Sequence, residues 1–280
     1  MTPVAGPAQS LTRAPAGRKR GGVLAAVHAE WVKLRTVSGP GWLLLACAVV
    51  TITVSAAVVA VEKCSSASCA VDTTKLSLTG VQVGQAAVAV LGVMVVGGEY
   101  ATGMVRLTLA AVPRRSVMLA AKAAAVAVVT AAAGIIAVLG SLLAGRIFLP
   151  GDGFTVARGF LPLSLGNGPT LRAAVGSVLY LVLVALFSLG VAAAVRDTAA
   201  AIAIVLGVMY VVRGVSSLVL DPAWQLRIDR VVPMNAGLAI QSTTNLTKLP
   251  IGPWPGLGVL AAWTAAALLA GWLLLRLRDA

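Results

Sequence analysis

The sequence contains few acidic residues and almost no histidine. Only 9 of its 280 residues are Asp or Glu, against 22 Lys and Arg, and its one histidine is His28. Acid–base, nucleophilic and metal chemistry draw on His, Cys and carboxylates, whereas a lone His in a basic segment is usually a solvated side chain. The sequence also lacks a G-x-x-x-x-G-K-[ST] phosphate loop. We therefore expect no catalytic residue, no metal site and no cofactor in this chain, so any ATP must be bound by another chain.

Charge is scarce because apolar residues dominate the chain. Hydrophobic residues make up 59% of it and charged residues 11%, which is more apolar than a soluble core of this size needs. The apolar residues gather in runs of about 20, long enough to cross a ~30 Å hydrocarbon layer. The runs are 41–61, 80–98, 119–145, 173–195, 198–220 and 256–275. The sequence thus predicts an all-α polytopic membrane protein with six transmembrane helices.

The positive net charge of +13 would also fit a nucleic-acid-binding protein. Here, however, the basic residues flank the apolar runs and do not form one basic face, so we expect the lipid bilayer as partner and no nucleic acid. The short segments next to the runs are densely basic on one side of the membrane, which predicts that both termini are cytoplasmic. Lys122, at the start of the third run, is expected to extend toward the membrane surface.

The N-terminal part divides into a tail and an amphipathic segment. Residues 1–22 are rich in Ala, Pro and Gly and predict a flexible cytoplasmic tail, followed by an interfacial helix at 23–40 and a transmembrane domain at 41–280. The stretch "GVLAAVHAEWVKLRTVSGPG" has apolar residues at helical spacing, with Trp31 at headgroup depth and Lys33 and Arg35 near anionic lipid. Gly39, Pro40 and Gly41 should end this helix. The alternative is a basic flank that only fixes topology.

A second amphipathic segment, "GGEYATGMVRLTLAAVPRR" at 97–115, lies between the second and third runs. At 100° per residue, Glu99, Thr102 and Arg106 share one face of a helix, and apolar side chains occupy the opposite arc. Pro113 should end this helix. Such a stripe is usually only solvated, but its position also leaves room for docking a soluble partner.

Isolated polar residues within and beside the apolar runs do not by themselves indicate a function. Arg213, in the fifth run, could extend outward, pair with an acid such as Asp221, or face a polar pathway, and we favour the first two. No buried Asp or Glu is expected as a proton relay. Cys64 and Cys69 lie in a loop predicted to face an oxidising space, where a disulfide is plausible.

Four segments occur in an order and spacing typical of a known family. They are "AEWVKLRTVSGPGWLLL" (29–45), "GGEYATGMVRLTLAAVPRRSVMLAAK" (97–122), "RDTAAAIAIVLGVMYV" (196–211) and "PWPGLGVLAAWTAAALLAGWLLLRLRDA" (253–280). Together they resemble the type-2 ABC exporter permease family, in the form common in GC-rich, antibiotic-producing bacteria. The second segment is the most specific, although it departs from the family at Ala101, where relatives often carry a basic residue.

The resemblance implies an N-terminal connecting helix at about 23–37, a cytoplasmic coupling helix at about 99–112 between transmembrane helices 2 and 3, and an outer re-entrant segment within 221–255. It also implies that two permease copies act with two separate ABC ATPase subunits, which bind ATP and Mg. The residues expected to contact the ATPase are Glu99, Tyr100, Thr102, Arg106, Arg114 and Arg115.

The predicted function is therefore that of a multi-pass permease subunit in the cell membrane, which exports a small molecule, lipid or drug. An ion-coupled secondary transporter is one alternative, disfavoured by the lack of intramembrane acids and of an evident inverted repeat. The other alternative is a non-transporting membrane protein that recruits a soluble partner.

Overall fold

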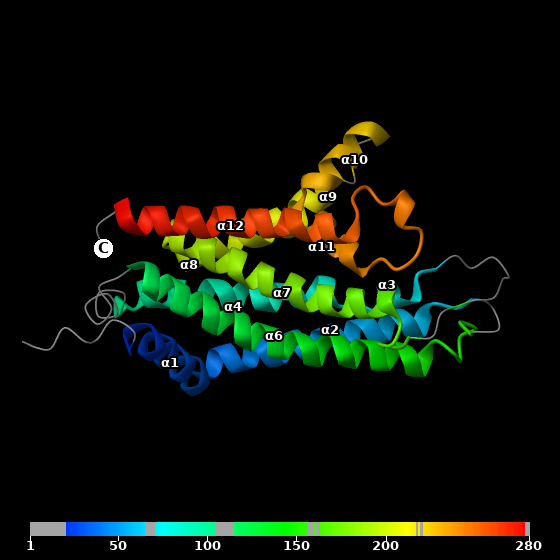
Figure 1. Cartoon of the computed structure of the whole chain (residues 1–280), viewed down its shortest axis with the longest axis horizontal. Coiled ribbons are helices and arrows are strands. Elements are labelled where there is room, and N and C mark those ends of the chain that lie inside the picture. The colour runs from blue at the N-terminus through cyan, green and yellow to red at the C-terminus, as the bar shows by residue number, and fades with distance from the viewer. Residues whose placement is uncertain are drawn as a thin grey trace, which may run out of the picture.

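Six long apolar helices run side by side along one axis of the molecule (Figure 1). The computed structural model describes residues 21–64, 71–104, 115–155, 160, 163–216, 218 and 221–277, and all regular elements among them are helical. The long helices are α2 (Ser38–Val61), α4 (Val81–Ala101), α6 (Arg115–Phe148), α7 (Gly168–Val195), the continuous segment α8–η2–α9 (Thr198–Leu206, Gly207–Val211 and Val212–Ser216) and α12 (Pro253–Leu277). Each is long and apolar enough to span a membrane, which confirms the predicted all-α class with six spans.

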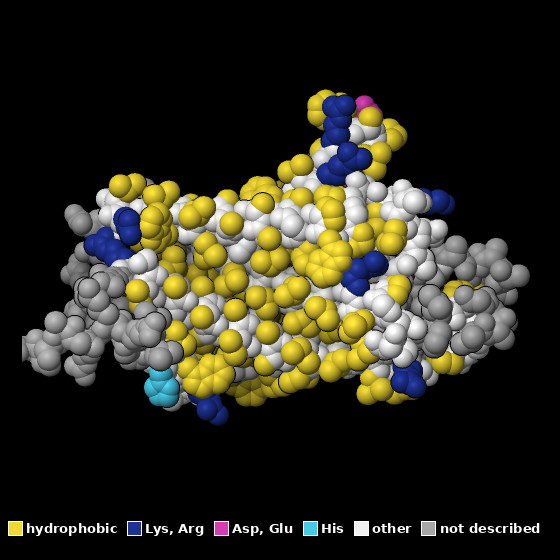
Figure 2. Space-filling model, viewed as in Figure 1, with side chains coloured by type: hydrophobic (Ala, Val, Ile, Leu, Met, Phe, Trp, Pro, Cys, Tyr) yellow, Lys and Arg dark blue, Asp and Glu magenta, His cyan; other side chains and the backbone are white. Residues whose placement is uncertain are grey.

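Shorter helices lie at the two ends of the bundle. Helix α1 (Gly21–Thr36) lies at the same end as the C-terminus, which we call the α1 end (Figure 1). The opposite, α10 end carries α3 (Thr73–Ser77), α10 (Pro222–Val231), α11 (Pro233–Leu238), η3 (Ala239–Gln241) and η4 (Leu246–Lys248). Hydrophobic side chains cover the flank between the ends, and α10 stands out from the bundle (Figure 2).

Helix α7 lies at the centre, packed most extensively against α12 and α4 and also against α6 and α8. Its contact with α12 depends on small residues. A Cβ on Gly190 would lie 2.6 Å from the carbonyl carbon of Ala267 and 2.7 Å from the backbone nitrogen of Leu268. Such close backbone approach is how membrane helices gain van der Waals contact without a hydrophobic driving force.

The break between the interfacial helix and the first span differs from the prediction. It falls at Val37, whose backbone is extended, and Gly39, Pro40 and Gly41 already belong to α2. The prediction that these three residues end the first helix is therefore wrong. Pro40 lies in the first turn of α2, where backbone N–H groups have no intrahelical partner, so the missing N–H of proline costs nothing there.

Helix α4 extends further than predicted at the α1 end. Glu99 and Tyr100 form its last turn, and the chain leaves the helix at Thr102 and Gly103, where the φ angle of the glycine is +70°. The predicted separate helix at 99–112 is thus corrected at its start, because nothing before Gly103 interrupts the helical backbone. Residues 105–114 lie outside the described part of the chain.

The segment 221–255 folds back against the bundle. Asp221 begins α10 by accepting a hydrogen bond from the backbone nitrogen of Ala223 (2.8 Å), and no residue of α10 is buried. In contrast, α11 and η3 are buried against α7 and α12, where Ile240 lies against Gly176. The segment therefore combines a protruding helix with a buried helical stretch in which α11 runs directly into η3.

Two glycines provide a matched test of the α7–α12 contact. We expect Gly190→Ala to lower stability by about 1–3 kcal/mol, because its methyl group would force the two backbones apart. A methyl group on Gly258 of α12 would meet no described heavy atom within 4 Å, so Gly258→Ala should be neutral or stabilise by up to about 1 kcal/mol through helix propensity. Thermal unfolding of both variants in detergent measures the difference, and equal midpoints would refute the contact.

Candidate functional site at the α1 end

Four charged side chains from three helices meet at the α1 end, and we call them the four-charge cluster. They are Glu30 and Lys33 from α1, Glu99 from the last turn of α4 and Lys122 from α6. The Lys122 ammonium donates to both carboxylate oxygens of Glu30, each at 3.0 Å, and to Glu99 Oε1 at 2.7 Å. Lys33 donates to Glu30 Oε1 at 3.4 Å and also to Glu99. The cluster thus holds two charges of each sign and is neutral as a whole.

Burial makes this neutrality essential. Lys122 is 1% exposed, Glu30 6% and Glu99 7%. Removing an isolated charge from water costs several kcal/mol, and only close partners of opposite sign with good hydrogen-bond geometry offset that cost. The cluster supplies both, since each carboxylate contacts two lysines and Lys122 contacts two carboxylates.

Lys33 connects the cluster to solvent. Its side chain is 37% exposed, so it is less buried than the other three members. Burial by itself would lower the pKa of Lys33, but the hydrogen bond from Lys33 to Glu99 and the negative charges of Glu30 and Glu99 outweigh it and hold that pKa above its ordinary value. Lys33 is therefore positively charged throughout the physiological pH range.

One sequence-based expectation fails at this cluster. Lys122 does not extend toward the membrane surface, because acids from two other helices meet it inside the bundle. Glu30 and Glu99 are both buried, but each is paired with two lysines, and the expectation that no buried acid serves as a proton relay stays a prediction. The sequence analysis gave Glu30 and Lys122 no partner. The available signal was the presence of a lysine about two turns into an apolar helix, which requires acidic partners.

The other predicted contact residues surround the cluster without joining it. Tyr100 is half-buried, with the Arg196 guanidinium 5.7 Å from its ring centroid. Thr102 is exposed, and its hydroxyl donates to the carbonyl of Gly98 in its own helix (2.9 Å). Arg106 and Arg114 lie outside the described residues, so their roles stay predictions.

Arg115 and Arg196 hold the end of α12. Arg115 donates to the carbonyl of Leu275, and Arg196 donates to the carbonyl of Leu274 at 3.0 Å. The last carbonyls of a helix lack intrahelical donors and carry partial negative charge, so both guanidinium groups complement this end. Part of the basic character predicted at the membrane surface therefore serves to fix α12 against α6 and α7.

The remaining predicted residues lie apart from the cluster. The Arg35 guanidinium is 5.9 Å from the ring centroid of Trp31 on the same helix. Cys64 is buried at the α10 end beside Val59 and is disulfide-bonded. Its predicted partner, Cys69, lies outside the described residues.

Arg213 also lies at the α10 end, where its Nη1 donates to Gln82 Oε1 at 3.1 Å. Within the described part of the chain it forms no ion pair with Asp221, and it borders a polar pocket instead. Of the three alternatives for Arg213, the pairing with Asp221 is not formed, whereas the outward extension and the polar pathway stay predictions.

The fold defines the chain as a multi-pass membrane protein. Comparison with models of known protein families finds no match, and comparison with curated proteins finds none either. The function proposed below therefore depends on the residues of this chain.

Removal of single charges tests the cluster. We expect Lys122→Met to cost about 3–5 kcal/mol, because it leaves two buried carboxylates with one shared lysine. The same substitution at Lys33 also leaves one lysine for the two carboxylates, but Lys33 is 37% exposed and water can reach the acids from its side, so it should cost less, about 1–2 kcal/mol. Adding Glu30→Gln and Glu99→Gln to Lys122→Met should recover most of the loss, since no buried acid is then unpaired. Unfolding by SDS, followed by tryptophan fluorescence, measures each variant, and equal effects of the two lysine substitutions would contradict this assignment.

Proposed function

We propose that the chain is the permease subunit of an ATP-driven exporter in the cell membrane. It acts with a separate ABC ATPase, which binds ATP and Mg, and with a second permease copy. The observation that carries this proposal is the four-charge cluster. It joins α1, which is not a spanning helix, to the ends of α4 and α6, which border the connection between these two spans.

The cluster suits the transmission of movement. A partner that presses on the connection between α4 and α6 would displace the ends of both helices. The ion pairs of Lys122 with Glu30 and Glu99 would carry that displacement to α1, because separating them exposes unpaired buried charges. Coupling also requires that the two states of the ATPase contact this connection differently.

This mechanism divides the predicted contact residues into two roles. Glu99 faces Lys33 and Lys122 inside the protein, so it positions the helices. Thr102 is exposed just beyond α4, and with Arg106 and Arg114 it would meet the ATPase directly.

A second permease copy is supported by the unequal burial of the spans. In the most apolar part of each helix, 56% of residues are buried in both α4 and α7, but only 28% in α2, 22% in α12 and 17% in Thr198–Ser216. The latter three helices present apolar faces that lipid or a second copy would cover. Most of the buried side chains are Ala, Val, Leu, Ser and Thr, and a pathway between such helices would suit a small molecule, a lipid or a drug as cargo.

Co-purification tests this function. The chain is expressed with the ABC ATPase encoded nearest to its gene and purified through a tag on the permease. We expect a stable complex with vanadate-sensitive ATP hydrolysis, because this chain has no phosphate loop of its own. Arg106→Ala with Arg114→Ala should weaken binding of the ATPase about a hundredfold or more, if each arginine contributes one charge-assisted hydrogen bond. The control Lys63→Ala removes a charge at the α10 end, and an equal loss in that control would argue against docking at 102–115.

The ion-coupled alternative has one supporting observation, which is that Glu30 and Glu99 are buried acids. Both are paired with lysines at the end of the bundle, whereas a proton relay needs a titratable group along the transport pathway. Export from vesicles that stops without ATP but continues with a protonophore would exclude this alternative, and the reverse pattern would support it.

Cysteine labelling tests the proposed orientation. His28 and Thr247 are exposed at the α1 end and the α10 end, respectively. With the natural cysteines replaced, an impermeant maleimide should label Thr247→Cys on intact cells, and it should label His28→Cys only after permeabilisation. The opposite pattern would place the α1 end outside and overturn the proposal.

A further inference from the structure

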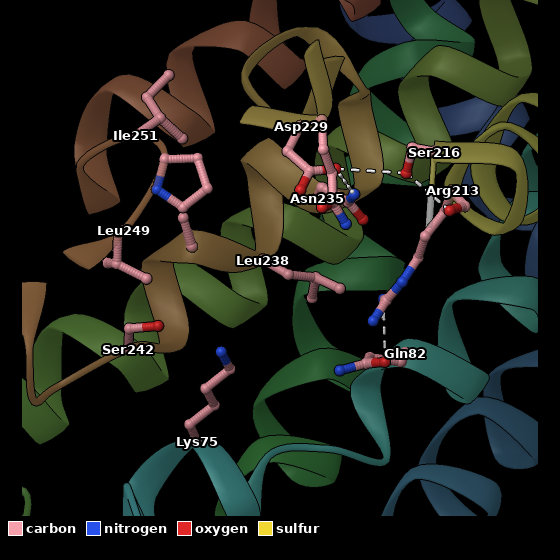
Figure 3. Close-up of a pocket in the computed structure, with 13 residues that line it drawn as sticks. Lys75, Gln82, Arg213, Ser216, Asp229, Asn235, Leu238, Ser242, Leu249 and Ile251 are labelled. Carbon is pink, nitrogen blue, oxygen red and sulfur yellow. Dashed lines mark hydrogen bonds between the residues drawn. The ribbon is translucent and has the colours of Figure 1, made fainter. Parts of the chain in front are cut away.

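A polar pocket opens at the α10 end, on the side of the bundle away from the four-charge cluster. Its volume is about 320 Å³, within the lower range of ordinary ligand pockets. Helices α3, α4, α9, α10 and α11 contribute to it, together with the segment before α12 (Figure 3). The proposed coupling mechanism does not use these residues.

Two cationic side chains approach the pocket from different helices. Arg213 donates one hydrogen bond to the side chain of Gln82. The Tyr210 hydroxyl holds the same glutamine in place by donating to its backbone carbonyl at 2.6 Å. Tyr210 belongs to η2, a turn of π-helix, and such turns are frequent at functional sites. Lys75 extends into the pocket from α3 (Figure 3), and its ammonium has no acceptor among the described residues.

The single acid of the pocket is already satisfied by neutral groups. Asp229 Oδ1 accepts hydrogen bonds from Asn235 Nδ2 at 2.6 Å and from Ser216 Oγ at 3.3 Å. It forms no ion pair with Arg213 or Lys75 among the described residues. The lining therefore has one net positive charge, and both cations keep donors that no described residue uses.

An apolar wall completes the pocket opposite Arg213. It consists of Leu238, Leu249, Pro250 and Ile251. Figure 3 shows Leu249 and Ile251 on the side away from Arg213 and Gln82. A ligand that uses both features must carry a negative group at one end and an apolar group at the other.

We propose that this pocket binds a small amphipathic anion, a phosphate or carboxylate that bears a short apolar chain. The anionic group lies between Lys75 and Arg213, because charge-assisted hydrogen bonds to oxygen are the strongest these donors form. The apolar chain lies against Leu238 and Ile251. A soluble amphiphile and the headgroup region of an anionic lipid share this chemistry. The binding site is independent of the proposed function.

Hexyl phosphate serves as the probe. The purified chain in nanodiscs of zwitterionic lipid, with no ATPase present, is titrated by calorimetry. We expect saturable binding of hexyl phosphate and none of hexanol, which lacks the charge. Nanodiscs that contain anionic phospholipid separate the two sources: weaker apparent binding of the probe identifies lipid as a competitor, and unchanged binding identifies a soluble ligand.

Substitutions locate the binding. Arg213→Gln and Lys75→Gln should each weaken it about tenfold or more, as expected for loss of a hydrogen bond between charged groups. Asp229→Asn should strengthen binding, because it removes the only negative charge while keeping the acceptor oxygen. Lys248→Gln is the matched control: it removes a charge beside Leu249 from a side chain that does not line this pocket, and it should change binding less than about twofold, because Lys248 would not contact the ligand and its more distant charge is screened by salt.

Three results would overturn the proposal: no binding of hexyl phosphate, equal loss in Lys248→Gln and Lys75→Gln, or tighter binding of hexylamine than of hexyl phosphate. Lys75 is exposed, so its variant remains informative even if Arg213→Gln does not fold. Because no ATPase is present, failure here leaves the proposed exporter function untouched, and failure of co-purification leaves the pocket untouched.

Discussion

The arrangement of the α1 end depends on one constraint: a lysine buried within a membrane-spanning helix must be neutralised. Lys122 is 1% exposed and lies about two turns into α6, too deep for its ammonium to remain in water without a partner. Glu99 from α4 and Glu30 from α1 provide the opposite charge, and Lys33 balances the second acid. This requirement explains why a helix that does not span the membrane is nevertheless fixed to two that do. A purely apolar contact would be as stable but would not define the position of α1 as narrowly.

The rest of the bundle is held mainly by shape. Gly190 of α7 allows the backbone of α12 to approach it, and Gly256 of α12 similarly faces the carbonyl oxygen of Ala236 in α11. These contacts place α7 between α4 and α12, and they bury the contiguous helices α11 and η3. Arg115 and Arg196 then secure the far end of α12 by donating to its last carbonyls. Hydrogen bonds from polar side chains thus fix the end of α12, while small residues set the distance between the packed helices.

The sequence predicts the six spans well because length and apolarity decide them locally. It predicts the helix boundaries less well, because Pro40 is acceptable in a first turn and Glu99 continues α4. The partners of Lys122 could not be found by spacing, since Glu30, Glu99 and Lys122 meet only through tertiary packing. Arg213 was difficult for the same reason: its partner, Gln82, comes from another helix. Sequence patterns identify charged residues that need partners, but the fold determines which partners they receive.

Helix α4 connects the two functional proposals. Glu99 lies in its last turn within the four-charge cluster, and Gln82 lies in its first turn beside Arg213 and the pocket. Seventeen residues of α-helix separate them, about 26 Å at 1.5 Å per residue. Helix α4 is continuous from Gln82 to Glu99 and has no proline, so a shift or rotation imposed on Glu99 would reach Gln82 to the extent that the glycine pair Gly97–Gly98 does not absorb it by bending. Gln82 positions Arg213, and the same shift would therefore move one of the two cations proposed to hold the ligand. A physical link of this kind requires no other relay, because one rigid element belongs to both sites.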